Sequence, residues 1–211
     1  MSHRGCVASS CNYLEISAIG GNLVSNETIR AVACAARNEL RLPFAALSLG
    51  SSEFSCTTSL FIRDVMVMPQ TFAPCAVTAA GKDVCVIPQL PLEHEDSGSA
   101  AVLRSYAGCP VFDRESHCVG VFYVMNTKPC RFSPAGVAQL RVYTQLIANH
   151  IEILRRFGID GPDPSPREIV CRADRVARQG RHNEARRLIT LAYTAHDIAC
   201  LRRRQQTSTL S

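Results

Sequence analysis

The chain has 211 residues, of which 46% are hydrophobic and 19% charged, so it is large enough for one well-packed domain and is not intrinsically disordered. Its formal net charge is +5, but residues 165–211 hold ten arginines and only four acidic residues. Residues 1–164 are therefore close to neutral, with 13 basic and 14 acidic side chains, and the basic character belongs to the C-terminal segment.

Apolar runs and cysteines indicate the compartment. No apolar run reaches the roughly 20 residues that a membrane-spanning helix needs, and residues 1–15 lack the apolar core of a secretory signal. The eleven cysteines are an odd number and lack the regular spacing of a secreted disulfide framework. We therefore expect a soluble, cytoplasmic protein without a transmembrane segment, whose thiols are mostly reduced packing groups.

Residues 1–24 are predicted to form a flexible leader, because small and polar residues dominate them. His3, Cys6 and Cys11 offer three potential zinc ligands, but the spacing is not that of a CxxC motif. Incidental cysteines are the favoured interpretation, and no metal site is predicted.

The first half of the domain begins with a predicted helix over residues 26–40, which ends before Pro43. Its apolar residues recur at spacings of three and four: Ile29, Val32, Ala33 and Ala36. Apolar and β-branched density predicts strands at residues 43–50 and 59–69, with a polar serine-rich connection between them.

The next segments alternate between structure and loop. Residues 72–81 are predicted to form a short helix, residues 82–90 a compact buried strand, and residues 90–100 an acidic loop. His94 lies among the carboxylates of this loop, which could bind a divalent cation or raise the histidine pKa, although a solvated loop is favoured. Residues 105–126 are predicted to form two strands joined by a polar turn.

A helix is predicted over residues 134–157, because Ser133 is a natural cap and Pro134 suits the first helical position. It carries two apolar stripes: Val137, Leu140, Thr144, Ile147, Ile151 and Leu154 on one face, and Val142, Leu146 and Ile153 on another. A sheet can cover only one of them, so we predict a homodimer through Ile147, Ile151 and Leu154. The alternative is that the C-terminal segment folds back over this helix.

The C-terminal segment is predicted to start with a proline- and glycine-rich linker at residues 158–166. A basic αα-hairpin over residues 167–205 follows, with its turn at Gly180, and residues 206–211 are a predicted disordered tail. We interpret its arginines as a solvated basic face, since no recognition helix or stacked aromatic residues accompany them, and nucleic-acid binding is not expected.

This order of elements predicts an α+β domain with a mostly antiparallel sheet and helices gathered on one face. The segment from Tyr106 to Ser133 resembles the second half of a GAF domain. Its aromatic-Ala-Gly-x-Pro strand ends at Pro110, a strand containing Gly120 follows, and then come Lys128-Pro129 and the Phe-Ser pair that opens the last helix. Residues 72–90 resemble the matching earlier segment, so the likeness covers residues 25–157.

The resemblance to GAF domains implies a small-molecule sensor whose ligand lies between the sheet and its short helices, and a dimer or partner contact through terminal helices. The residues expected around such a pocket are Cys75, Cys85, Arg104, Tyr106, Cys109 and Phe122. Motifs of the cyclic-nucleotide, bilin and free methionine sulfoxide reductase subtypes are not recognisable here. We therefore predict a non-catalytic sensory or regulatory module with an unidentified ligand and cofactor. The alternative is a GAF-fold redox enzyme that acts through a pocket cysteine.

Overall fold

The structure is a computed structural model, and it describes residues 27–50, 56–60, 65–66, 73–90, 103–157 and 163–208. The predicted leader, the acidic loop around His94 and residues 158–162 of the predicted linker lie outside the described residues.

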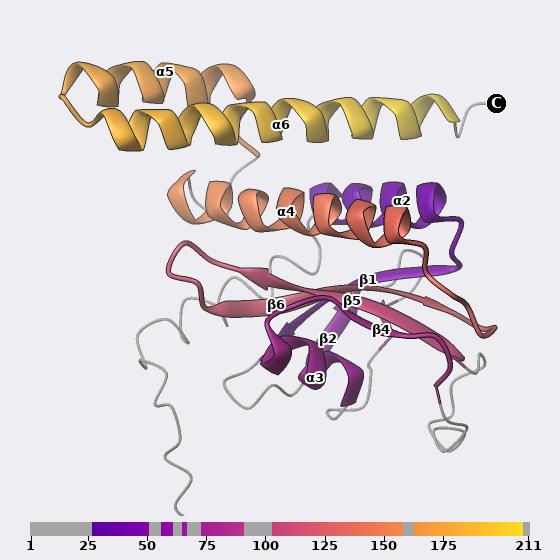
Figure 1. Cartoon of the computed structure of the whole chain (residues 1–211). Helices are drawn as coiled ribbons and strands as arrows, with labels where there is room; N and C mark the ends of the chain where they lie inside the picture. Colours follow the sequence, from indigo (N-terminus) through magenta and orange to yellow (C-terminus); the bar gives the residue numbers. More distant parts are fainter. Residues whose placement is uncertain are drawn as a thin grey trace, which may run out of the picture.

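A six-stranded antiparallel sheet forms the centre of the molecule, with strand order β3-β2-β1-β6-β5-β4 (Figure 1). In chain order the strands are β1 (Phe44–Gly50), β2 (Cys56–Leu60), β3 (Val65–Met66), β4 (Cys85–Ile87), β5 (Ser105–Phe112) and β6 (Cys118–Asn126). The hairpin predicted at residues 105–126 is confirmed as β5 and β6. Its turn is stabilised by Asp113 Oδ1, which accepts the backbone N–H groups of Glu115 and His117 at 3.1 and 2.8 Å.

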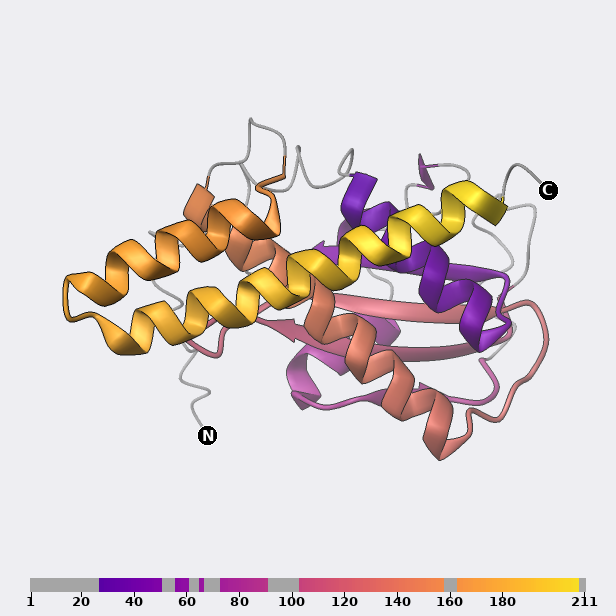
Figure 2. The same cartoon turned by 90° about the horizontal axis from the view of Figure 1, so that it is seen from above.

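The helices are arranged in layers around this sheet. They are α2 (Glu27–Leu40), α3 (Ala73–Gly81), α4 (Pro134–Phe157), α5 (Pro166–Arg178) and α6 (His182–Ser208). Figure 1 shows α2 and α4 on one face of the sheet, α3 on the other, and α5 and α6 beyond the α2–α4 layer. Figure 2 shows α6 crossing over both α2 and α4. No helix in the described part of the chain is long and apolar enough to cross a membrane.

The predicted α+β fold is confirmed, and its helices occupy both faces of the sheet rather than one. The physical reason lies in the alternation of β6, whose successive side chains point to opposite faces. Phe122 and Val124 pack beneath α2 and α4, whereas Tyr123 and Met125 form an apolar cluster on the other face. This second cluster needs a cover of its own, and α3 supplies it.

Two strand predictions differ from the structure. In place of the strand predicted at residues 59–69, the structure has two shorter strands, β2 and β3, which pair with each other. β2 begins at Cys56, inside the segment predicted as a polar connection. The β-branched residues Thr57 and Thr58 suit an extended backbone despite their polarity. The strand predicted as buried is β4, which lies at the edge of the sheet and leaves Val86 37% exposed.

The chain itself covers the first apolar stripe of α4 and part of the second, of which Val142 stays 57% exposed. Ile147, Ile151 and Leu154 are at most 4% exposed and belong to the core between α4, α2 and the sheet, which Ile198 of α6 also joins. Ile153 is buried in a separate cluster with residues of α5 and α6. The fold-back alternative is therefore the arrangement observed. A homodimer would have to use other residues than the three predicted for it.

Local signals define the C-terminal hairpin. α5 begins at Pro166, one residue before the predicted start, and Ser165 caps it in a capping box with Glu168. Gly180 forms the turn with a φ of 78°. α6 continues to Ser208, three residues into the segment predicted as a disordered tail. Residues 209–211 lie outside the described part of the chain.

Candidate functional site

A buried polar cluster lies between α3 and the sheet. Thr78 Oγ1 donates its hydrogen to the carbonyl of Pro74 at 2.7 Å. It therefore has to accept the hydrogen bond from the Tyr106 hydroxyl, at 2.8 Å, because a hydroxyl has only one hydrogen to donate. The same phenol lies 3.7 Å from Cys75 Sγ, and burial raises the pKa of Tyr106 well above its ordinary value. Tyr106 is thus a neutral hydrogen-bonding group.

Neighbouring residues lock the Tyr106 ring in place. The ring stacks on Tyr123 of β6 with centroids 5.7 Å apart and an interplanar angle of 30°. A methyl group added at Gly108 would collide with the hydroxyl and ring carbons of Tyr106. Gly108 therefore leaves space for the side chain of Tyr106, two residues before it on the same strand. This explains the glycine of the aromatic-Ala-Gly-x-Pro motif.

Of the other predicted residues, Cys85 lies at the margin of this cluster, and Arg104 adjoins a residue that does. Cys85 of β4 is half-buried against it and pairs with Gly108 in the β4–β5 register. Arg104 directly precedes β5, next to Leu103, which packs against the cluster. The Nε atom of Arg104 is buried and has no hydrogen-bond partner among the residues that the structure describes. Cys75, Cys85 and Tyr106 are thus brought together at the α3 face.

Cys109 and Phe122, the other two predicted residues, lie on the opposite face of the sheet. Phe122 is fully buried in the core beneath α2 and α4. Cys109 lines a groove of about 200 Å³ between β5 and α4, together with Lys82, Asp83, Pro110, Phe112, Arg141, Thr144, Gln145 and Ala148. The residues predicted for one pocket therefore lie on both faces of the sheet.

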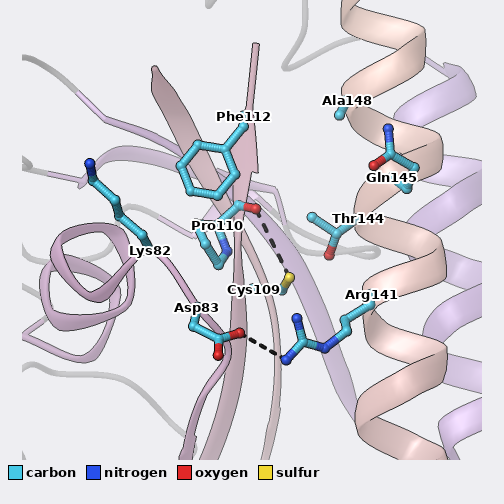
Figure 3. A pocket seen from close by; sticks show the side chains of 9 residues that line it. All are labelled: Lys82, Asp83, Cys109, Pro110, Phe112, Arg141, Thr144, Gln145 and Ala148. Carbon is cyan, nitrogen blue, oxygen red and sulfur yellow. Dashed lines mark hydrogen bonds and ion pairs between the residues drawn. The ribbon is translucent and has the colours of Figure 1, made fainter. Parts of the chain in front are cut away.

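Figure 3 shows the groove, with β5 on one side and the α4 side chains on the other. The carboxylate of Asp83 pairs with Arg141 at 2.8 Å across it, and Cys109 Sγ lies 4.0 Å from the carbonyl oxygen of Pro110. Burial raises the pKa of the Cys109 thiol. This is the opposite of the shift that thiolate catalysis requires.

Sequence reasoning missed Thr78 and Tyr123. Thr78 follows Cys75 by three residues, so both lie on one face of the short helix, and this spacing was a usable signal. The position of Tyr123 depends on the pairing of Gly108 with Tyr123 across β5 and β6, which no local pattern reveals.

Comparisons with known proteins place this architecture in a wider context. A family model described as the GAF domain matches residues 25–151. No curated protein matches the sequence significantly. Solved structures to which the chain is similar include the GAF domain of a phosphoenolpyruvate-protein phosphotransferase from Acinetobacter, 15% identical, covering 72% of this chain and 98% of that chain with a TM-score of 0.47.

Two other solved structures are similar to the chain at comparable levels. The photoproduct state of GAF3 from Slr1393 of Synechocystis is 16% identical, covering 61% of this chain and 96% of that chain, with a TM-score of 0.43. The free methionine-R-sulfoxide reductase from Neisseria meningitidis is 16% identical, covering 74% of this chain and 99% of that chain, with a TM-score of 0.46.

Proposed function

Because the chain belongs to the GAF domain family, we propose that it is a non-catalytic sensory or regulatory module that binds a small ligand at the α3 face and signals through its C-terminal helices. The observation that carries this proposal is the position of α4 between the sheet and the α5–α6 hairpin (Figure 1). One helix contacts both the element that would sense and the element that would respond.

The α3 face offers the chemistry for such a ligand. The fully buried rings of Tyr106 and Tyr123 form an aromatic layer beneath this face, and the half-buried side chains at its margin, Cys85, Ile87 and Leu103, are apolar. Small-molecule sites are mostly apolar with a few placed polar groups. A ligand with an apolar body fits this description.

The route from this face to the hairpin runs through α4. Ile147 and Ile151 pack in the core formed with the sheet, and Ile153 packs against the hairpin. Asn149 Nδ2 donates to Thr194 Oγ1 of α6 at 3.0 Å, and Glu152 pairs with Arg187 of α6. Close packing transmits small displacements, so a shift of β5 or β6 would move α4 and, with it, the hairpin.

The output would be read by a partner protein. Ile189 and Tyr193 of α6 are 37% and 70% exposed and follow each other by one helical turn. Large exposed apolar side chains are typical of interaction surfaces. The redox-enzyme alternative gains no support from Cys109, because burial keeps its thiol protonated.

Native mass spectrometry of the freshly purified protein, compared with its denatured mass, tests the ligand. We expect a bound small molecule whose occupancy falls in Tyr106→Phe and stays unchanged in Val142→Ala, an exposed substitution on α4. An empty protein that also shows no thermal shift with any member of a metabolite panel would contradict the proposal.

A further inference from the structure

The outward side of α6 carries two apolar residues between two opposite charges. Ile189 and Tyr193, which are 37% and 70% exposed, follow each other by one helical turn. The exposed Arg186 lies three residues before Ile189, and the exposed Asp197 lies four residues after Tyr193. Spacings of three and four place these four residues, which we call the α6 stripe, on one side of the helix. Figure 2 shows α6 in front of α2 and α4, in the outer layer of the protein.

The two charges of the α6 stripe lack intramolecular partners. Among the residues that the structure describes, neither Arg186 nor Asp197 forms an ion pair. Neighbouring arginines of the hairpin do, since Arg187 pairs with Glu152. Arg186 and Asp197 cannot neutralise each other, because 11 residues of helix hold them roughly 16 Å apart along the helix axis. Both charges are therefore available to another molecule.

We propose that the α6 stripe is the contact between two copies of this chain, whose α6 helices pair antiparallel about a two-fold axis at Leu191, midway between Ile189 and Tyr193. A two-fold contact is self-complementary, because residue i touches residue j and j touches i. Ile189 of each copy then packs against Tyr193 of the other. Arg186 lies five residues before the axis and Asp197 six residues after it, so each Arg186 meets an Asp197 of the other copy.

The order of the charges selects both this occupant and its orientation. In a parallel pair, each Arg186 would face the other Arg186 and each Asp197 the other Asp197, and like charges repel. An anionic surface, such as a membrane or a nucleic acid, would attract Arg186 but repel Asp197. An antiparallel second copy supplies the opposite charge at both ends. Each copy contributes only two large apolar residues, so the association should be weak and reversible.

This inference deepens the proposed function and rests on it for its meaning, since it identifies the protein that reads the α6 surface as a second copy of the chain. A ligand that moves α4, and with it the hairpin, would then change the affinity of the two copies for each other. By linkage, dimerisation would change the affinity for the ligand by the same factor.

Sedimentation velocity of the full chain, over a series of concentrations in a reducing buffer, tests the contact without any ligand. The reducing agent excludes dimers that a disulfide links. The wild type should pass reversibly from monomer to dimer, with the dimer prominent at hundreds of micromolar. Tyr193→Glu should remain monomeric, because it places two carboxylates in the apolar centre of the contact.

Charge reversal tests the pairing itself. Arg186→Glu and Asp197→Arg each oppose like charges at both ends of the contact, so each should raise the dissociation constant about tenfold. The double variant restores opposite charges in exchanged positions and should dimerise within a factor of about two of the wild type. Arg131→Glu is the matched control, since it makes the same change of net charge at an exposed position between β6 and α4 and should leave dimerisation unchanged.

Several outcomes would overturn the inference. A wild type that stays monomeric at every concentration leaves the α6 surface to a different protein. A dimer that survives Tyr193→Glu uses another face, and one that tolerates both single reversals is not antiparallel about Leu191. A double variant that associates no better than the single ones, although its circular dichroism matches that of the wild type, equally refutes the pairing. Native mass spectrometry reports the ligand separately, so a monomer with a bound ligand would refute this inference and not the proposed function.

Discussion

Replacing Ile153 by alanine would measure how firmly the hairpin is attached to α4. Ile153 is 1% exposed and is the fully buried α4 residue in the cluster that includes Ile169 and Leu188. The change removes three carbon atoms, worth about 0.8 kcal/mol each, or roughly 2.4 kcal/mol of transfer free energy. The cavity left behind adds to this loss, so the free energy of unfolding should fall by about 3 kcal/mol.

Equilibrium unfolding in urea, followed by circular dichroism, gives this free energy, and hydrogen exchange shows where protection is lost. The amides of α5 and α6 should lose protection first. Val142→Ala is the matched control, because Val142 lies on the same helix and is 57% exposed, so its effect should stay within about 0.5 kcal/mol. If Ile153→Ala cost no more than this control, the hairpin would not be packed on α4 as described.

Burial lowers the pKa of His150 to about 4 from the ordinary 6.5. Between these two pH values, the histidine is protonated in the unfolded chain and neutral in the folded chain. The contribution of neutral His150 to the free energy of unfolding should be fully present above pH 6.5 and fall by on the order of 3 kcal/mol toward pH 4. Urea unfolding at a series of pH values measures this, and the free energy of unfolding should depend less on pH in His150→Gln. Native thiol labelling followed by peptide mapping should modify the exposed Cys171 well before the buried Cys109, and equal rates would contradict that burial. Tyr106→Phe should lower the free energy of unfolding by about 1–2 kcal/mol, since it leaves Thr78 without its donor, and a thermal-unfolding midpoint equal to that of the wild type would argue against this hydrogen bond.

The elements with strong local signals could be predicted from the sequence. The helix at Pro134–Phe157 has the predicted bounds, because Ser133 and Pro134 mark its start and an apolar repeat runs through it. The β5–β6 hairpin could be predicted equally well, since two apolar runs flank a short polar turn. The strand at Cys56–Leu60 could not be predicted, because its polar composition resembles that of a loop and its extended conformation depends on pairing with β1.

The candidate sites depend on contacts between distant segments, and this limits what the sequence reveals. Cys109 and Tyr106 are three residues apart on one strand, so the period of two places them on opposite faces, although both are among the residues predicted for one pocket. The pairing of Glu152 with Arg187 joins residues that are 35 positions apart, and only the docking of the hairpin creates it.

In the proposed function, α4 relays events at the α3 face to the C-terminal hairpin. Hydrogen exchange of the full chain, measured with and without the small molecule that co-purifies or that thermal-shift screening identifies, tests it most directly. We predict that the ligand changes exchange both in the segments around Tyr106 and Thr78 and in α5 and α6. Changes confined to α3 and the neighbouring strands, with exchange in α5 and α6 unaltered, would contradict the relay.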